Sequence, residues 1–259
     1  MPASERSVLL SVRDTLAVIT LNSPETGNLI DTALARAFRE ACETIAGDQG
    51  VRAVIVRSTL PDFCVGGRPP APPDHQAPDF ANARVAAPLG QLVQPVIAAL
   101  TGTVADQGLE LALAADIRIA SPDTCLAMRQ VVNGGFPFDG GTQRLTRIAG
   151  PALATEMLLT GETVAADEAR SRGLITEIAA DPHSRAEQVA RDIARHGIQA
   201  SAYTKKAVLA AGDMTFDEGA KLEADLSFLL HGKDERQEGL AAFREGRKPR
   251  MPEAPRDAS

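Results

Sequence analysis

The sequence predicts an α/β fold in which short apolar strands alternate with amphipathic helices. Two observations carry this prediction: runs of β-branched residues recur through the first half of the chain, and helical patterns separate them. Such alternation is typical of helices packed on a mostly parallel sheet. The chain has 259 residues and is 44% hydrophobic. At this length a chain buries roughly three quarters of its unfolded surface and needs neither a disulfide nor a structural metal.

The first half is predicted to begin with a hairpin and to continue as alternating helices and strands. Strand signals, rich in apolar and β-branched residues, lie at residues 7–12, 15–21, 51–56, 95–100 and 116–120. Asp31 is suited to cap a helix that ends before Gly50. Its apolar residues recur at helical spacing and are Leu34, Phe38, Ala41, Cys42 and Ile45. A second helix, built of small residues, begins at about Gln107.

After Pro137 nearly every pattern is helical. The predicted helical segments lie at residues 140–148, 152–159, 165–171 and 184–196. A glycine follows each of them, where a helix C-terminus favours it, at Gly150, Gly161, Gly173 and Gly197. Capping-box spacing marks the start of the last two helices, in Thr215 with Glu218 and in Asp234 with Gln237.

Prolines crowd into one segment of the chain. Eight of the 17 fall between Pro61 and Pro95. Because proline fixes φ and removes a backbone donor, regular structure is not expected there before about Ala81. A loop this long inside a compact domain is a functional loop, a disordered segment or a tolerated surface insertion.

Charge and cysteine content exclude several classes of partner. The net charge of -7 argues against a nucleic-acid or anionic-membrane surface, because such surfaces are basic. No apolar run approaches the roughly 18 residues that a membrane span requires. Three widely spaced cysteines fit reduced thiols in the cytoplasm better than a disulfide framework. The common metal-binding, phosphate-binding and nucleophile-elbow motifs are absent from the sequence, so no metal is expected.

Two glycine-bearing turns, each after a predicted strand, are the candidates for chemistry. The first is FCVGG at residues 63–67, and the second is ADQGLE at residues 105–110. Glycines in such places indicate tight turns, and Glu110 on its own fits a surface residue that stabilises a helix dipole. A carboxylate beside such a turn also suits general acid–base work.

The second turn lies in one of four stretches that resemble the enoyl-CoA hydratase/isomerase (crotonase) superfamily. The stretches are LAVITLNSPETGNLID, PVIAALTGTVADQGLELALAADIRIAS, GGFPFDGGTQRLTRIAGPALATEMLLTGETVAADEARSRGLITEI and EGLAAFREGRKPRM. The resemblance implies a crotonase-like spiral of ββα units over residues 1–195 and a helical trimerisation region over residues 196–259. It also implies a homotrimer or a hexamer, a dimer of trimers. The substrate would be an acyl-CoA, with coenzyme A as part of the thioester and no separate cofactor.

The resemblance also assigns roles to individual residues. The backbone N–H groups of Gly67 and Gln107 would form the oxyanion hole, and Gln107 replaces a glycine of the family pattern. Glu110 matches the first catalytic glutamate of the hydratases. The second falls on Gln130, which cannot give or take a proton at neutral pH. Substrate-binding positions would be Val65, Gly66, Arg68, Gly108, Phe136 and Phe138, with the proline-rich segment covering the substrate.

Asp139 leaves the reaction open. It stands before a predicted helix, where it is either an N-cap or a second acid/base beside Glu110. The leading hypothesis is hydration or double-bond isomerisation of an enoyl-CoA through a thioester enolate. One alternative is a β-diketone or acyl-CoA C–C hydrolase or lyase that uses Asp139, since 6-oxocamphor hydrolase is similar at this place. Another is a catalytically silent acyl-CoA-binding paralogue.

Overall fold

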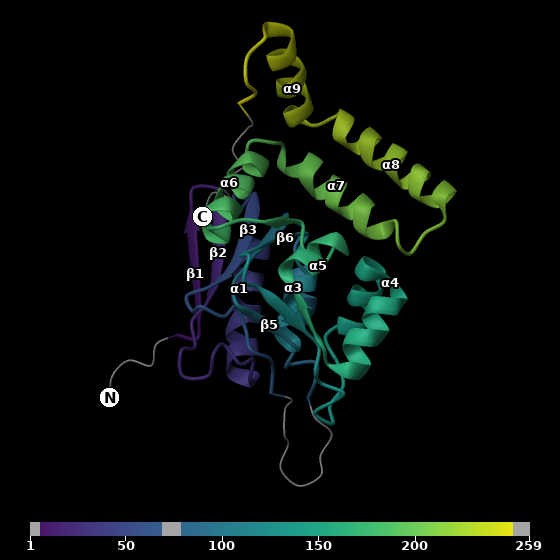
Figure 1. Cartoon of the computed structure of the whole chain (residues 1–259). Coiled ribbons are helices and arrows are strands. Elements are labelled where there is room, and N and C mark those ends of the chain that lie inside the picture. The colour runs from purple at the N-terminus through teal and green to yellow at the C-terminus, as the bar shows by residue number, and fades with distance from the viewer. Residues whose placement is uncertain (1–5, 69–78, 251–259) are drawn as a thin grey trace.

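The computed structural model describes residues 6–68 and 79–250 and contains two sheets (Figure 1). The larger has the order β1-β2-β3-β4-β6-β9, and only its β1–β2 pair is antiparallel. Its strands are β1 Val8–Arg13, β2 Leu16–Leu21, β3 Ala53–Ser58, β4 Val96–Leu100, β6 Ile117–Ala120 and β9 Glu177–Ile178. The smaller sheet has the order β5-β7-β8, with strands β5 Thr103–Ala105, β7 Cys125–Ala127 and β8 Thr163–Ala165.

Helices cover the larger sheet and then leave it. In chain order they are α1 Thr32–Gly47, α2 Ala86–Gly90, α3 Gln107–Leu113, α4 Gly141–Thr160, α5 Ala166–Ser171, α6 Pro182–Ala194, α7 Ile198–Ala210, α8 Phe216–His231 and α9 Asp234–Glu245. Figure 1 shows α8 and α9 projecting away from the sheets at the top of the view. The α/β class predicted from the sequence is confirmed.

Alternation along the central strands divides the core between two faces. On β3, Ala53 and Ile55 pack with α6, whereas Val54 and Val56 belong to the larger core that includes α1. Strand β4 alternates in the same way, because side chains of successive strand residues point to opposite faces. Both strands are buried on each face, which is typical of parallel strands covered by helices.

The helix predicted to begin after Asp31 and to end before Gly50 is confirmed as α1. The Asp31 carboxylate accepts a hydrogen bond of 2.8 Å from the Leu34 N–H, which is N-cap geometry. All five apolar residues predicted for its inner face are buried, namely Leu34, Phe38, Ala41, Cys42 and Ile45. The hairpin of β1 and β2 is also confirmed, with Val8 opposite Leu21 and Arg13 opposite Leu16.

Several predicted helix ends need correction. Thr215 and Glu218 form the capping box that the spacing predicts, but the Asp234 and Gln237 pair is wrong, because Lys233 is the N-cap and Asp234 is already helical. Gly197 does not end α6. It has φ -63° and begins α7 instead. Gly150, with φ 81° and ψ 161°, interrupts α4 where the sequence predicts a break.

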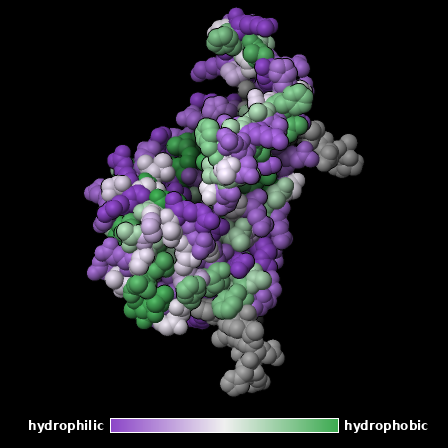
Figure 2. Space-filling view, turned by 90° about the vertical axis from the view of Figure 1, so that its right-hand side faces the viewer, coloured by the Kyte–Doolittle hydropathy of each residue, from purple (hydrophilic) through white to green (hydrophobic). Residues whose placement is uncertain are grey.

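The boundary between predicted regions at residues 195 and 196 falls in the turn that joins α6 to α7. Beyond it the helices carry large apolar side chains at the surface, with Phe216 89%, Phe228 79% and Phe243 85% exposed. Figure 2 shows hydrophobic side chains among polar ones over this projecting part. The function of the region remains a prediction. In residues 6–68 and 79–250, no helix has both the length and the apolar character needed to cross a bilayer.

Candidate functional site

The two glycine-bearing turns lie side by side because the first turn pairs with a strand of the smaller sheet. Cys64 and Val104 form a parallel bridge, in which the Cys64 N–H donates to the Thr103 carbonyl (3.1 Å) and the Ala105 N–H donates to the Cys64 carbonyl (2.9 Å). The chain then continues from Cys64 into Gly67 and from Ala105 into Gln107. Local pairing therefore brings together two turns that lie 40 residues apart in the sequence.

Each turn ends in a backbone N–H that is free to bind a ligand. Within the part of the chain that the structure describes, neither the Gly67 N–H nor the Gln107 N–H has a hydrogen-bond acceptor. Gly67 is held on its other side by its bridge to Ile30, and Gln107 is the first residue of α3, whose initial N–H groups have no partner within the helix. Two such donors at one place suit a developing oxyanion.

Backbone conformations that favour glycine hold these donors in place. Gly66 has φ 144°. Asp106, immediately before the second donor, has φ 50° and ψ -120°. This backbone conformation is unfavourable in free energy for any residue other than glycine. The Asp106 carboxylate offsets this cost by accepting a hydrogen bond of 2.5 Å from the Arg129 N–H. The short Asp106 side chain therefore ties the second turn to the segment that follows β7.

Close packing between the turns explains why the second turn carries Gly108. A Cβ on Gly108 would lie 2.6 Å from both Cβ and Sγ of Cys64. A Cβ on Gly67 would lie 2.2 Å from Oε1 of Gln107. Any larger residue at either position would force the turns apart and move the two N–H donors relative to each other.

Glu110, one helical turn after these donors, is a completely buried carboxylate. Its Oε2 accepts hydrogen bonds from the N–H groups of Asp139 (2.7 Å) and Gly141 (2.9 Å), and its Oε1 accepts one from Nε2 of Gln130 (3.0 Å). Burial nevertheless dominates and raises the pKa of Glu110 from 4.5 to about 7. A carboxyl group with such a pKa both takes and returns protons at neutral pH.

Gln130 lies between Glu110 and a small cavity. The cavity has a volume of about 130 Å³, and its lining includes Gly67, Gln107, Gln130, Phe136 and Phe138. The structure therefore brings together both predicted oxyanion donors and both positions that match the family's glutamates. Three further lining residues were not predicted from the sequence, namely Asp106, Asn133 and Gly135.

The Asp139 carboxylate accepts hydrogen bonds from the start of a neighbouring helix, α2. Its Oδ2 accepts hydrogen bonds from the N–H groups of Val85 and Ala86, both 2.6 Å, and its Oδ1 accepts one from Ala87 (3.0 Å). It thus binds the start of α2. The prediction that Asp139 caps the following helix is wrong, because the N-cap of α4 is Gly140. Asp139 is 3% exposed, and burial raises its pKa. It does not line the cavity.

The remaining predicted substrate-binding residues are distributed around the cavity. Phe138 packs against Phe80 with ring centroids 4.9 Å apart, whereas Phe136 is 69% exposed at the cavity rim. Val65 packs on Gly27, Gly66 is buried, and the Arg68 side chain is exposed at the edge of the described region. Most of the proline-rich segment, residues 69–78, lies outside the described residues.

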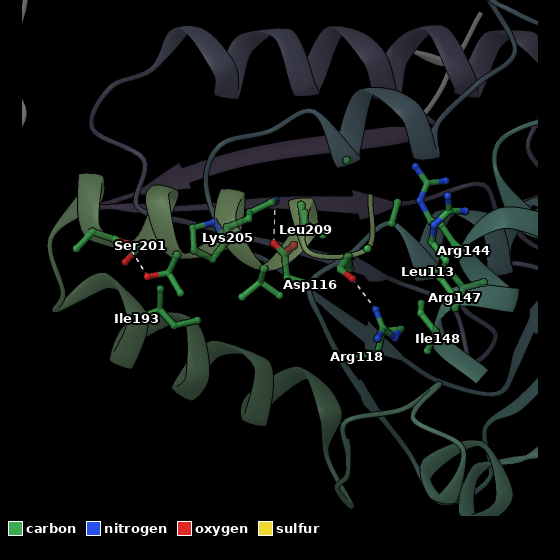
Figure 3. A pocket seen from close by; sticks show the side chains of 18 of the residues that line it. Leu113, Asp116, Arg118, Arg144, Arg147, Ile148, Ile193, Ser201, Lys205 and Leu209 are labelled. Carbon is green, nitrogen blue, oxygen red and sulfur yellow. Dashed lines mark hydrogen bonds and ion pairs between the residues drawn. The ribbon is translucent and has the colours of Figure 1, made fainter. Parts of the chain in front are cut away.

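A second and larger pocket, of about 920 Å³, is lined in part by Arg144 (Figure 3). Arg144 borders this pocket and also donates a hydrogen bond of 2.6 Å to the Asp139 carbonyl. Figure 3 shows Lys205 of α7 paired with Asp116, at 2.8 Å. The lining of this pocket includes neither Gly67 nor Gln107. The smaller cavity is lined by both and by Gln130, which binds Glu110, so we place the candidate site there.

Among residues 6–68 and 79–250, no group of three or more His, Cys, Asp or Glu side chains is arranged to hold a metal ion. The smaller cavity is lined by side-chain amides, one carboxylate, that of Asp106, and the two residues with free N–H groups, Gly67 and Gln107. These two N–H groups suit an acyl oxygen.

Comparisons with known proteins identify the family of the chain. A family model described as enoyl-CoA hydratase/isomerase matches residues 11–254. A mitochondrial enoyl-CoA hydratase of Pongo abelii is 33% identical over 240 residues, covering 91% of this chain and 83% of its own length. An (E)-benzylidenesuccinyl-CoA hydratase of Thauera aromatica is 32% identical over 250 residues, covering 93% and 97%. The crystal structure of an enoyl-CoA hydratase from Mycobacterium tuberculosis superposes with a TM-score of 0.87 at 27% identity, covering 96% and 100% of the two chains.

Proposed function

Because this chain belongs to the enoyl-CoA hydratase/isomerase family, we propose that it moves a proton on an acyl-CoA thioester through an enolate held in an oxyanion hole. One observation carries the proposal: two unoccupied backbone N–H donors, of Gly67 and Gln107, lie near a buried carboxyl group, Glu110, whose pKa is raised to about 7. The donors would bind the thioester oxygen, and Glu110 would be the acid/base.

The steps balance with a single carboxylate. Glu110 takes the α-proton of a 3-enoyl-CoA, and the C–H electron pair moves into the enolate, whose oxygen accepts hydrogen bonds from Gly67 and Gln107. The protonated Glu110 then returns the proton to the γ-carbon, and the double bond comes to lie beside the thioester. Preorganised donors lower the barrier because they are in place before charge develops.

Isomerisation has more support than hydration. Adding water requires a base for the water and an acid for the α-carbon, and Gln130 supplies neither. Asp139 has less support as a replacement. Neither the Glu110 nor the Asp139 carboxylate lines the cavity, but Glu110 binds Gln130, which does line it, whereas the carboxylate oxygens of Asp139 accept three backbone N–H groups at the start of α2. The same contacts reduce the support for a C–C hydrolase or lyase based on Asp139.

The test incubates the protein in deuterated water with a short 3-enoyl-CoA and, separately, with the matching 2-enoyl-CoA. We expect deuterium exchange and double-bond movement, with hydration at least tenfold slower. Glu110→Gln should lower the exchange rate by roughly 10²–10⁴-fold, the usual contribution of general acid–base catalysis. Glu162→Gln, an exposed carboxylate replaced in the same way, is the matched control and should keep the wild-type rate.

Three outcomes would contradict the proposal in different ways. If hydration is as fast as double-bond movement, the protein would be a hydratase despite Gln130. Binding of the thioester without exchange would identify a silent acyl-CoA-binding protein. If no thioester binds and a β-diketone is cleaved instead, the alternative based on Asp139 would replace the proposal.

We further propose that residues 196–259 build a homotrimer, with a hexamer of two trimers as the alternative assembly. The large apolar side chains exposed on α8 and α9 support this, since Phe216, Phe228 and Phe243 are each at least 79% exposed. Exposed apolar patches of this kind mark protein–protein contacts.

We also propose that the protein acts in the cytoplasm. Cys42, Cys64 and Cys125 are unpaired in the structure, which supports a reducing compartment. Cell fractionation with an antibody to the chain would test this, because several relatives are named as mitochondrial.

A further inference from the structure

Asp106 places a carboxylate in the lining of the smaller cavity. Its Oδ1 accepts the hydrogen bond from the Arg129 N–H, whereas its Oδ2 accepts none from the described residues. Asp106 is half-buried, and this second oxygen is not fully enclosed by protein. Glu110, in contrast, is fully buried and does not itself line the cavity. Asp106 is therefore the carboxyl group of this site that a bound molecule can touch directly.

The usual structural role of an aspartate before a helix does not account for Asp106. Such a residue accepts a hydrogen bond from one of the first N–H groups of the helix. Asp106 is the N-cap of α3, but its side chain makes no such bond. Its φ of 50° and ψ of -120° favour glycine. The bond to Arg129 uses one carboxylate oxygen and leaves the other without a structural role.

The free oxygen lies beside the residues that carry the two oxyanion donors. A Cβ on Gly66, the residue before Gly67, would lie 3.3 Å from Oδ2 of Asp106, and Asp106 directly precedes Gln107. An enolate oxygen bound to the two N–H groups would thus form close to this carboxylate. Burial already raises the pKa of Asp106, and a second negative charge nearby raises it further. Enolate formation therefore favours the protonated form of Asp106, which is an acid.

Glu110 is held in one orientation on the other side of Gln130. Its oxygens accept three hydrogen bonds, from Gln130, Asp139 and Gly141. A general acid or base must lie within hydrogen-bond reach of each proton that it moves. The proposed isomerisation moves one proton from the α-carbon and another to the γ-carbon. A carboxyl group fixed in this way suits one of these two carbons better than both.

We propose that Asp106 is a second acid/base of the site and delivers the proton to the γ-carbon. This inference rests on the proposed function and gives its second step to a different residue. Glu110 takes the α-proton, and the C–H electron pair moves into the enolate. Asp106 then gives its proton to the γ-carbon. The β,γ electron pair forms the new C–H bond, the enolate pair becomes the α,β double bond, and the thioester carbonyl forms again. Solvent restores the starting state, because Glu110 loses a proton and Asp106 gains one.

The experiment measures two rates with 3-butenoyl-CoA in deuterated water. One is deuterium uptake at the α-carbon of recovered substrate, and the other is formation of 2-butenoyl-CoA. Asp106→Asn removes the acid and keeps an oxygen that can accept the Arg129 N–H. We expect α-exchange to stay near the wild-type rate, because Glu110 performs it. Double-bond movement should fall by roughly 10²–10⁴-fold, the usual contribution of a general acid.

A second variant separates this role from a structural one. Asp106→Gly also removes the carboxyl group, and glycine adopts a φ of 50° without strain, so the variant should fold. It should likewise exchange the α-proton without moving the double bond. A residue that only held the turns in place would lower both rates together, because both depend on the oxyanion donors. Asp123→Asn, at an exposed aspartate, is the control and should change neither rate.

Each result either supports the inference or overturns it. Equal loss of both rates in the two variants would make Asp106 a structural residue and overturn the inference. Unchanged double-bond movement would also overturn it and leave Glu110 as the acid. A substrate deuterated at the α-carbon and converted in ordinary water gives a further check, since deuterium at the γ-carbon would show that Glu110 itself returns the proton. If the wild-type protein shows neither exchange nor movement, the proposed function fails, and this inference fails with it.

Discussion

At the scale of single residues, the pKa of Glu110 is set chiefly by burial, with a smaller contribution in the same direction from the charge of Asp139. Three hydrogen bonds from Gln130, Asp139 and Gly141 favour the carboxylate, yet burial has the larger effect and raises the pKa from 4.5 to about 7. The charged form is therefore the minority species below neutral pH. A catalytic base must be unprotonated, so activity should follow this pKa.

We predict that proton exchange on the acyl-CoA rises with pH and levels off above pH 7, because the midpoint is the raised pKa of Glu110, about 7. Below the midpoint the rate should fall about tenfold per pH unit, as expected for a single titrating group. Initial rates measured between pH 5 and 9, which brackets the midpoint by about two units on each side, would give the profile. A midpoint near the ordinary glutamate value would show that Glu110 is not the base.

Neighbouring residues at the site differ in how far the sequence could predict them. The positions of Gly67, Gln107, Glu110 and Gln130 follow from resemblance to the family, and the structure brings them together. The unpartnered carbonyls of Gln107 and Gln130 could not be predicted, because they depend on where the amide nitrogens find acceptors. One of those acceptors, the Ala83 carbonyl, is 24 residues away in the sequence.

At the scale of elements, Asp139 joins the start of α2 to the start of α4. Its carboxylate accepts the N–H groups of Val85, Ala86 and Ala87, while its own N–H donates to Glu110. Donors at a helix start otherwise have no partner in the helix. The contact spans up to 54 residues, so no local spacing predicts it, and the sequence alone favoured a cap on the following helix.

We predict that Asp139→Asn lowers the free energy of unfolding by about 1–3 kcal/mol, because an amide removes the negative charge and one acceptor from three buried donors. Urea denaturation followed by circular dichroism would measure this. Asp123→Asn, an exposed aspartate with the same substitution, should change stability by less than about 0.5 kcal/mol. Loss of activity at unchanged stability would instead return Asp139 to the role of a second acid/base.

Element prediction succeeded where one strand or helix carries its own pattern. All strands of the larger sheet except β9 were predicted, because each forms a run of four to six residues rich in apolar side chains. The smaller sheet was missed, since β5, β7 and β8 have three residues each and pair only with distant segments. Such short strands depend on tertiary contacts rather than on local propensity.

At the scale of the whole molecule, the projecting helices support the proposed assembly of several chains. Figure 1 shows α8 and α9 away from the sheets, and their exposed apolar side chains have no cover within the described part of the chain. An isolated helix pair with phenylalanines in water gains stability when a second surface buries them.

We predict that analytical ultracentrifugation gives three or six times the 27.3 kDa of one chain. Phe228→Glu, which places a charge at a side chain 79% exposed in the single chain, should shift the population toward the single-chain mass. Lys221→Glu, at an exposed polar position of the same helix α8, is the control. A wild-type protein that sediments as one chain would contradict the proposed assembly.

The tight packing of Cys64 against Gly108 has a practical consequence for labelling the protein. Cys64 is buried, and burial raises the pKa of its thiol to about 12. The thiolate is the reactive form, so this cysteine is inert toward alkylating reagents while the two turns stay together. The rate at which Cys64 is alkylated would therefore report how often the two turns separate.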